Sequence, residues 1–423
     1  MAGPPAVGRI WHRDQSCSGR SPMDRPPGRS ESYDAAAAAE LLAYSFPADD
    51  TIAERTRTWP RDRVYAVESE GELASVILWR VVTVLDHGNP LLMALAGPGA
   101  TAATARGRRV LAGSQTDFLA AMRDAGCVLS GLETPIPKWH QNNGWGICLS
   151  VARFTGAPAD LAWPSRTGAG SAVRFDPPHE LVASVYEDCA RDRFGLLERS
   201  AADWADLRRV GPGELRRDVV GAVAEGGDRG YAVLVHRLVG DGAGLEIEVR
   251  ELFHTGPSAL ARLLYFLVSH NNVARLRWDA PPEVELWSAT SHARTWEPVR
   301  ALDKLVRVVN LAGLSLATNA FPGTGVIRVI DSQAPWNDGL WRIIGDGERI
   351  TFTSLAAAPP TSADQAAGDV TVQACALAPF LLGASSPWWL RDSGLLSAPN
   401  EHALSQVSRL VGTRRPPYCP DSW

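Results

Sequence analysis

The stretch "GATAATARGRRVLAG", residues 99–113, decides how the first part of the chain folds. It follows an apolar run at 90–102 that is typical of a strand and is interrupted by two glycines and a proline, which predicts a bulge or splay. It precedes residues 109–126, whose apolar side chains recur at helical spacing. The stretch therefore joins a splayed strand to a helix.

Three arginines, Arg106, Arg108 and Arg109, fall at the predicted start of that helix. The helix macrodipole is positive there, and each cation should cost about 0.3–1 kcal/mol. Either the arginines extend into water, or the position binds an anion. Free backbone N–H groups together with guanidinium groups suit a pyrophosphate. We favour an anion at Arg106 and Arg108.

The flanking segments predict a mixed sheet with helices. Residues 34–46 are strong helix formers that end before a proline, and 64–69, 74–85 and 127–132 have strand-like apolar patterns. The same order of strand, strand, helix and strand recurs at 230–280, but no basic turn opens that second helix. We therefore expect no nucleotide there.

Composition bounds the class of protein. With 423 residues, 45% hydrophobic and 21% charged, the chain predicts a soluble protein of two or three domains. A net charge of -5 argues against a general nucleic-acid binder, and no apolar run approaches the roughly 20 residues that span a bilayer. We expect no nucleic-acid or membrane partner.

Six scattered cysteines lack any metal-ligand spacing with histidine, which predicts reduced thiols, a cytoplasmic location and no metal. Residues 1–30 are rich in Pro, Gly, Ser and Arg and are expected to be disordered, and Met23 is an alternative natural start.

From Met93 to Trp145 the chain resembles, without gaps, the N-terminal domain of GCN5-related N-acetyltransferases of the enhanced-intracellular-survival type. "GATAATARGRRV" matches the family pattern V-A-T-x-P-x-Y-R-G-R-G-V, and "SGLETPIPKWHQNNGWG" matches the following strand and loop. "VRFDPPHELVASVYEDCARDRFGLLERSAADW" resembles the start of a second such domain. "APFLLGASSPWWLRDSGLL" and the ending "PPYCPDSW" resemble a sterol-carrier-like domain.

The resemblance implies an α+β fold: two tandem acetyltransferase-like (GNAT-like) mixed-sheet domains followed by a sterol-carrier-like α/β domain. It places the first at 31–160, a degenerate second one at 161–302 and the third, with a docked C-terminus, at 303–423. It also implies acetyl-CoA as co-substrate, transfer of its acetyl group to an amine, and a homo-oligomer, in relatives a hexamer.

The resemblance assigns the family's functional positions to individual residues of this chain. The resemblance implies that His140 occupies the position of the general acid and that the terminal carboxylate of Trp423 is the base. The positions implied to bind the cofactor are Gly99, Ala100, Thr101, Arg106, Gly107, Arg108 and Arg109.

Two of these positions depart from the family pattern. Arg109 replaces a glycine that lets the backbone approach the phosphates, so its side chain either pairs with phosphate or fills the cofactor's place. His140 replaces a tyrosine, and a histidine near its ordinary pKa of about 6.5 can act as acid or as base near neutrality.

Four residues are candidates for substrate binding: Asp49, Trp79, Glu133 and Trp139. For each of them the alternative is an ordinary structural role in a loop, on the surface or in the core. Asp49 would attract a cationic amine, and the tryptophans, with Trp145, would wall a pocket. Three prolines and a terminal tryptophan in the last eight residues predict a stiff, docked tail.

Two functions remain open from the sequence. The first is a CoA-dependent N-acyltransferase acting on a small-molecule amine. The alternative is a divergent scaffold that has lost acetyl-CoA and catalyses a CoA-independent step on a small metabolite, or only binds one. The position of Arg109 discriminates between them.

Overall fold

The computed structural model describes residues 28–29, 33–108, 110–161, 173–239, 244–270, 272–286, 296, 298–318, 322–356, 370–412, 415–421 and 423. Of the segment expected to be disordered, Gly28–Arg29 forms a short strand, β1, that pairs with β2. That part of the expectation is wrong, and the rest of residues 1–30 lies outside the described residues. No described helix is long and apolar enough to cross a membrane.

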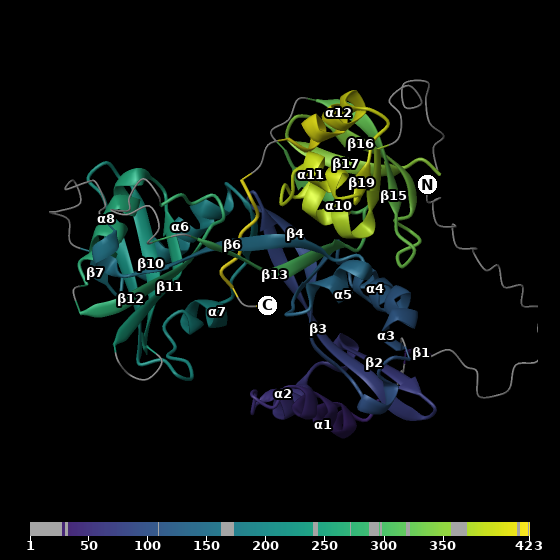
Figure 1. The fold of residues 1–423 in the computed structure, drawn as a ribbon, viewed down its shortest axis with the longest axis horizontal. Coiled ribbons are helices and arrows are strands. Elements are labelled where there is room, and N and C mark those ends of the chain that lie inside the picture. The colour runs from purple at the N-terminus through teal and green to yellow at the C-terminus, as the bar shows by residue number, and fades with distance from the viewer. Residues whose placement is uncertain are drawn as a thin grey trace, which may run out of the picture.

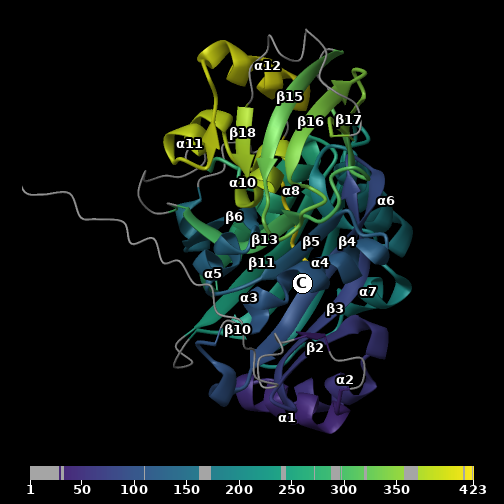
Figure 2. The ribbon, with the colours of Figure 1, turned by 90° about the vertical axis from the view of Figure 1, so that its right-hand side faces the viewer.

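The first domain has helices packed on a mixed sheet, as predicted (Figures 1 and 2). β2, β3 and β4 are antiparallel, whereas β4 and β5 run parallel with α4 between them. Its elements are α1 (Ala35–Ser45), α2 (Ile52–Thr58), β2 (Val64–Ser69), β3 (Glu72–Asp86), β4 (Asn89–Thr101), α3 (Val110–Gly113), α4 (Gln115–Asp124), β5 (Leu129–Glu133), α5 (Pro137–Asn142) and β6 (Gly146–Gly156).

The predicted splay of β4 is present. β4 pairs with β5 over Met93–Leu95 alone, and its remaining residues stay with β3 while β5 continues beside another strand. The β3–β4 register shifts between Ile77 and Trp79, opposite the glycine-proline segment. The two parallel strands therefore separate at their carboxyl ends.

The helix expected over 109–126 is divided in two. α3 has four residues, and α4 begins after Ser114, whose side-chain hydroxyl donates to Val110 O at 3.3 Å. A glycine and a serine in succession weaken a helix, because glycine costs about 1 kcal/mol and serine competes for backbone groups. The macrodipole argument for Arg106 and Arg108 therefore loses force, because the helix behind them is one turn long.

The second domain repeats the parallel pair, with β11 and β12 on either side of α8. α6 packs on its sheet against β10 and β11, and Trp204 of α7 packs against the same core; this domain occupies the left of Figure 1. Its elements are β7 (Arg174–Phe175), α6 (His179–Ala190), β8 (Phe194–Leu197), α7 (Ala201–Asp206), β9 (Arg216–Val223), β10 (Arg229–Leu238), β11 (Leu245–His254), α8 (Pro257–Val268) and β12 (Val273–Ala280).

The two domains share one sheet, because β6 of the first domain pairs with β12 of the second. β13 (Val299–Val308) lies between β5 and β6, antiparallel to both, and so closes a continuous 13-stranded sheet. We expected the third domain to begin at residue 303, and residues 303–308 instead belong to this sheet. A local pattern does not specify which sheet a strand joins.

The third domain has a six-stranded sheet and packs against one face of the large sheet. Leu95 and Leu129 of the first domain share a core there with Leu377 of α10. Its elements are β14 (Ser315–Ala317), β15 (Gly323–Ile330), β16 (Gly339–Gly345), β17 (Arg349–Ser354), β18 (Val370–Gln373), α10 (Ala374–Leu381), α11 (Pro387–Asp392), β19 (Leu396–Ser397) and α12 (Glu401–Val411).

A buried ion pair ties β13 to the third domain. Arg307 Nη2 lies 2.7 Å from Asp331 Oδ1, with the two side chains 1% and 3% exposed, and Arg307 Nη1 donates to Asn143 O at 2.7 Å. A buried pair is strongly destabilising when one partner is removed, because the other charge stays buried and uncompensated.

We expect Arg307→Ala to lower the free energy of unfolding by about 3–5 kcal/mol in urea denaturation. The matched control is Arg209→Ala, which removes a pair with Asp206 whose side chains are 72% and 55% exposed. The control should cost less than about 1 kcal/mol. Equal losses in the two variants would show that the Arg307 pair is not structural.

Candidate active site

The splay of β4 and β5 opens into a cavity of about 560 Å³ in the first domain. Its wall is mostly apolar and comes from the splayed strand, the turn after it, α4, and the loop that leads into α5. A cavity of this kind, with a few polar groups, is typical of a ligand site. The lining side chains include Phe46, Ile77, Val110, Leu111, Gln115, Phe118, Leu132, Thr134, Ile136 and Trp145.

Most residues expected to bind a cofactor lie on this wall: Gly99, Ala100, Thr101, Arg106 and Gly107. Arg106 Nε donates to Thr101 O at 3.3 Å, which holds the turn against the end of β4. Gly107 has φ +78°, a left-handed conformation that favours glycine.

The other two arginines of the turn differ from Arg106. Arg108 is exposed and lies 3.2 Å from Glu70 Oε1, and it does not line the cavity. Its expected role in holding the cofactor therefore has no geometric support, because its charge is directed to a surface carboxylate. Arg109 lies outside the described residues. Whether its side chain pairs with phosphate or fills the cofactor's place therefore stays a prediction.

His140 lies on α5 at the edge of the cavity, between two tryptophan rings. Its ring centroid is 4.7 Å from that of Trp139 and 6.3 Å from that of Trp145, both edge to face. Trp145 Nε1 donates to Ser130 Oγ at 3.4 Å, which ties this aromatic group to β5. His140 and Trp139 are therefore together in the cavity, as predicted.

This apolar environment changes the acid–base chemistry of His140. Burial lowers the pKa of His140 from 6.5 to about 4, because the charged imidazolium loses hydration among the tryptophan rings. The expectation of a pKa near 6.5 is thus wrong. At neutral pH the ring is uncharged, and it can donate one hydrogen bond and accept another.

The C-terminal tail reaches the same splay from the other face of the sheet. The backbone N–H of Trp423 donates to Glu133 Oε1 at 3.0 Å, and Glu133 also lies 3.1 Å from Lys304 Nζ. The Trp423 ring covers Gly131, where an added Cβ would come within 2.6 Å of it. Trp423 packs with Leu129, whereas α4 packs with Leu132 on the opposite face.

Docking of the tail was therefore predicted, but its anchor was not. Glu133 was a candidate for substrate binding, and it lies on the cavity wall, yet it also holds the tail. Lys304 could not be found from the sequence as a site residue, because it is 171 positions away and arrives on β13.

Two candidates for substrate binding do not line the cavity. Trp79 is 2% exposed and belongs to the core of the first domain, where Arg63 stacks on its ring at 4.6 Å. Asp49 accepts from Thr51 and pairs with Arg55 at 3.0 Å, so it orders the turn before α2. Trp79 and Asp49 therefore have structural roles, Trp79 in the core and Asp49 in the turn before α2.

A second cavity, of about 400 Å³, lies between the second domain, β3 of the first domain and the tail. It is lined by charged groups of both signs, among them Arg80, Glu198, Arg199, Glu251 and Asp421. Val82 of β3 lines it and packs with the same core cluster as Trp423, so this cavity lies on the tail's face of the sheet. No local pattern in the sequence predicts this cavity, because its wall comes from segments far apart in the chain.

Comparison with known proteins assigns three segments of the chain to domain families. Acetyltransferase (GNAT) domain models match residues 29–148 and 195–308, and a sterol carrier protein domain model matches residues 312–420. The chain belongs to the GCN5-related N-acetyltransferases. It is of the type in which two GNAT domains precede a sterol carrier protein domain.

A relative of known sequence matches part of the chain. An uncharacterized N-acetyltransferase of Streptomyces coelicolor is 28% identical over 262 residues, which are 58% of this chain and 63%, less than two thirds, of the relative.

Solved structures share the fold over most of the chain. A GCN5-related N-acetyltransferase from Anabaena variabilis aligns with a TM-score of 0.75 at 15% identity, covering 91% of this chain and 96% of its own. Eis1 from Mycobacterium abscessus aligns with a TM-score of 0.67 at 19% identity, covering 85% and 91%.

We expect the ring of His140 to titrate with a midpoint near pH 4 in NMR of the full chain, with its signals assigned by their loss in His140→Gln. The unfolded chain binds this proton near pH 6.5 and the folded chain does not. The contribution of His140 therefore destabilises the fold progressively as the pH falls from 6.5 toward 4. A midpoint near 6.5 would contradict the burial described above.

Proposed function

We propose that the protein is a CoA-dependent N-acyltransferase that transfers the acetyl group of acetyl-CoA to an amine of a small molecule. The observation that carries the proposal is the convergence of three features at one splay. These are the cavity with Arg106 on its wall, the neutral His140, and the terminal residue Trp423 on the opposite face.

The residues of the first cavity suit acetyl-CoA. Arg106 and the backbone of the turn would hold the pyrophosphate, because guanidinium and N–H groups form charge-assisted hydrogen bonds with phosphate oxygens. The backbone N–H groups of the splayed β4 would bind the pantetheine arm and polarise the thioester carbonyl. The apolar wall would exclude water from the thioester.

In the reaction, the amine nitrogen forms a bond to the carbonyl carbon and the carbon–sulfur bond breaks. The terminal carboxylate of Trp423 takes the proton that the nitrogen loses. The neutral ring of His140 donates a hydrogen bond to the leaving sulfur without giving up its proton, and the thiolate takes a proton from solvent. The products are the acetylated amine and free CoA.

The acceptor would approach through the second cavity, on the face of the sheet where the tail lies. The carboxylates of Glu198 and Asp421 and the guanidinium of Arg80 on its wall suit a polar amine rather than an apolar one. Its volume of about 400 Å³ fits a small molecule.

Arg106→Ala should raise the dissociation constant of acetyl-CoA at least about tenfold in calorimetric titration, because a charge-assisted hydrogen bond contributes about 1.5–3 kcal/mol. The matched control is Arg108→Ala, two residues away on the same turn, which should leave the affinity unchanged because Arg108 does not line the cavity. Absence of binding heat with the unaltered protein would instead favour the CoA-independent alternative.

Deletion of Trp423 should lower kcat by at least about 100-fold, the lower range for loss of a general base, with little change in the affinity for acetyl-CoA. Trp423→Phe keeps the terminal carboxylate and an aromatic anchor, and should retain most of the activity. Full turnover by the truncated chain in a thiol-release assay would exclude the carboxylate as the base.

A further inference from the structure

The last residues of the chain cross the second GNAT domain before they reach the first. The tail leaves the third domain and ends in the middle of the molecule (Figure 1). On its way Tyr418 N donates to Phe194 O at 3.1 Å, and Tyr418 OH donates to Asp279 O at 3.0 Å. Tyr418 is buried, so this part of the tail is packed into the second domain.

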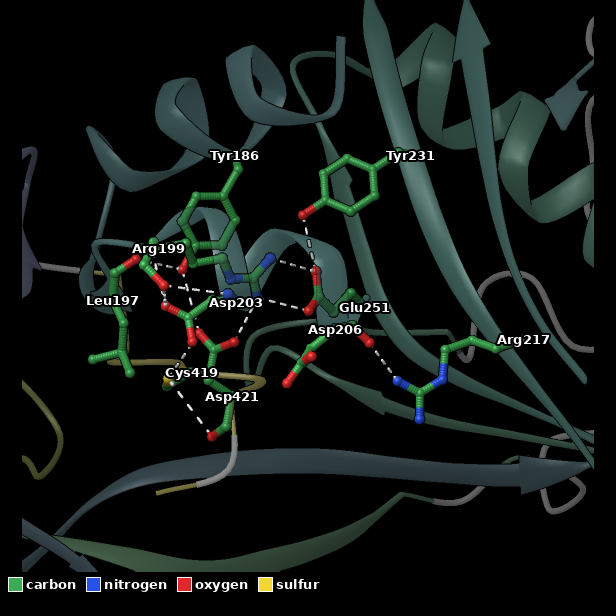
Figure 3. Close-up of polar contacts among 11 residues, drawn as sticks. Tyr186, Leu197, Arg199, Asp203, Asp206, Arg217, Tyr231, Glu251, Cys419 and Asp421 are labelled. Atoms are coloured by element: carbon green, nitrogen blue, oxygen red, sulfur yellow. Dashed lines mark hydrogen bonds and ion pairs between the residues drawn. The ribbon is translucent and has the colours of Figure 1, made fainter. Parts of the chain in front are cut away.

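Beyond Tyr418 the tail meets a buried ionic cluster of that domain (Figure 3). Arg199 Nη2 lies 2.7 Å from Asp421 Oδ1 and 2.6 Å from Glu251 Oε1, and Arg199 Nη1 donates to Glu251 Oε2 at 3.2 Å. Tyr231 OH donates to Glu251 at 2.9 Å, and Tyr186 OH lies 3.3 Å from Asp421 Oδ2.

The cluster is built to hold one geometry. The side chains of Arg199, Glu251 and Asp421 are 1%, 4% and 21% exposed, so the charges are screened little by solvent. The guanidinium of Arg199 lies 4.2 Å from the ring centroid of Tyr186 and 5.0 Å from that of Trp204. Planar stacking and a two-point pair with Glu251 fix the direction in which Arg199 presents its remaining N–H groups to the tail.

Asp421 is two residues from the chain end, and two residues span at most about 7 Å. The tail is thus held at Asp421 by the second domain and at the Trp423 N–H by Glu133 of the first. The terminal carboxylate belongs to Trp423, the residue whose N–H forms the second of these attachments.

We propose that Arg199, held by Glu251, is a positioning residue for the first domain's reaction: by binding Asp421 it fixes the terminal carboxylate of Trp423 at the splay. This gives the second GNAT domain a part in catalysis, although its own helix α8 opens without a basic turn. The inference rests on the proposed function insofar as that carboxylate takes the amine's proton.

The test uses Asp421→Asn in the full chain. The change keeps the shape of the side chain and the Arg199–Glu251 pair, but it removes the negative charge that pairs with Arg199 and so weakens the contact to the tail. Hydrogen–deuterium exchange of the C-terminal peptide should become faster. In acetyl transfer, kcat should fall about 10- to 100-fold, as expected for a displaced catalytic group, with the affinity for acetyl-CoA unchanged.

Two further variants separate positioning from general loss of structure. Asp421→Glu keeps the carboxylate and should restore part of the loss in kcat. Arg415→Gln alters the same tail at an exposed pair with Asp192, whose side chains are 58% and 63% exposed, and should change neither the exchange nor kcat.

The outcomes are distinguishable. If Asp421→Asn leaves the exchange of the tail unchanged, or speeds the exchange without lowering kcat, the positioning proposal is wrong. If the unaltered protein transfers no acetyl group to any amine, the proposed function fails. The exchange measurement then still decides whether Arg199 holds the tail.

Discussion

The insertion of β13 between β5 and β6 is the constraint on which the rest of the structure depends. Without it, β5 and β6 would each have an unpaired edge. With it, both belong to one sheet, and Lys304 and Arg307 are placed beside β5 and α5. The third domain then follows β13 directly and packs on the tail's face of that sheet.

That arrangement divides the site among parts of the chain that are far apart in sequence. The first domain supplies the cofactor-side cavity, and the tail supplies the terminal residue from the opposite face. The second domain, which lacks a basic turn of its own, supplies the buried cation at Arg199. The proposed chemistry therefore needs all three domains in their observed places, although the cavity at the splay belongs to one.

Burial accounts for the largest departures from the expected site chemistry. His140 carries the residue type and position expected of a proton donor, yet its tryptophan neighbours favour the neutral ring. Trp79, expected in the same wall, turns into the core instead, where the register shift in β3 places it. Neither outcome follows from residue type, because desolvation depends on what packs around a side chain.

The sequence by itself determined the elements, the splay of β4, the turn with Arg106 and Gly107, and the docking of a stiff tail. These depend on apolar periodicity, on glycine and proline, and on neighbours within a few residues. Only the tertiary structure decided which sheet β13 joins, which arginine of the turn faces the cavity, and that Arg199 and Glu133 hold the tail. Arg199 and Asp421 are 222 positions apart, Glu133 and Trp423 are 290 apart, and Glu70, which Arg108 contacts, is 38 positions away. No local pattern encodes such contacts.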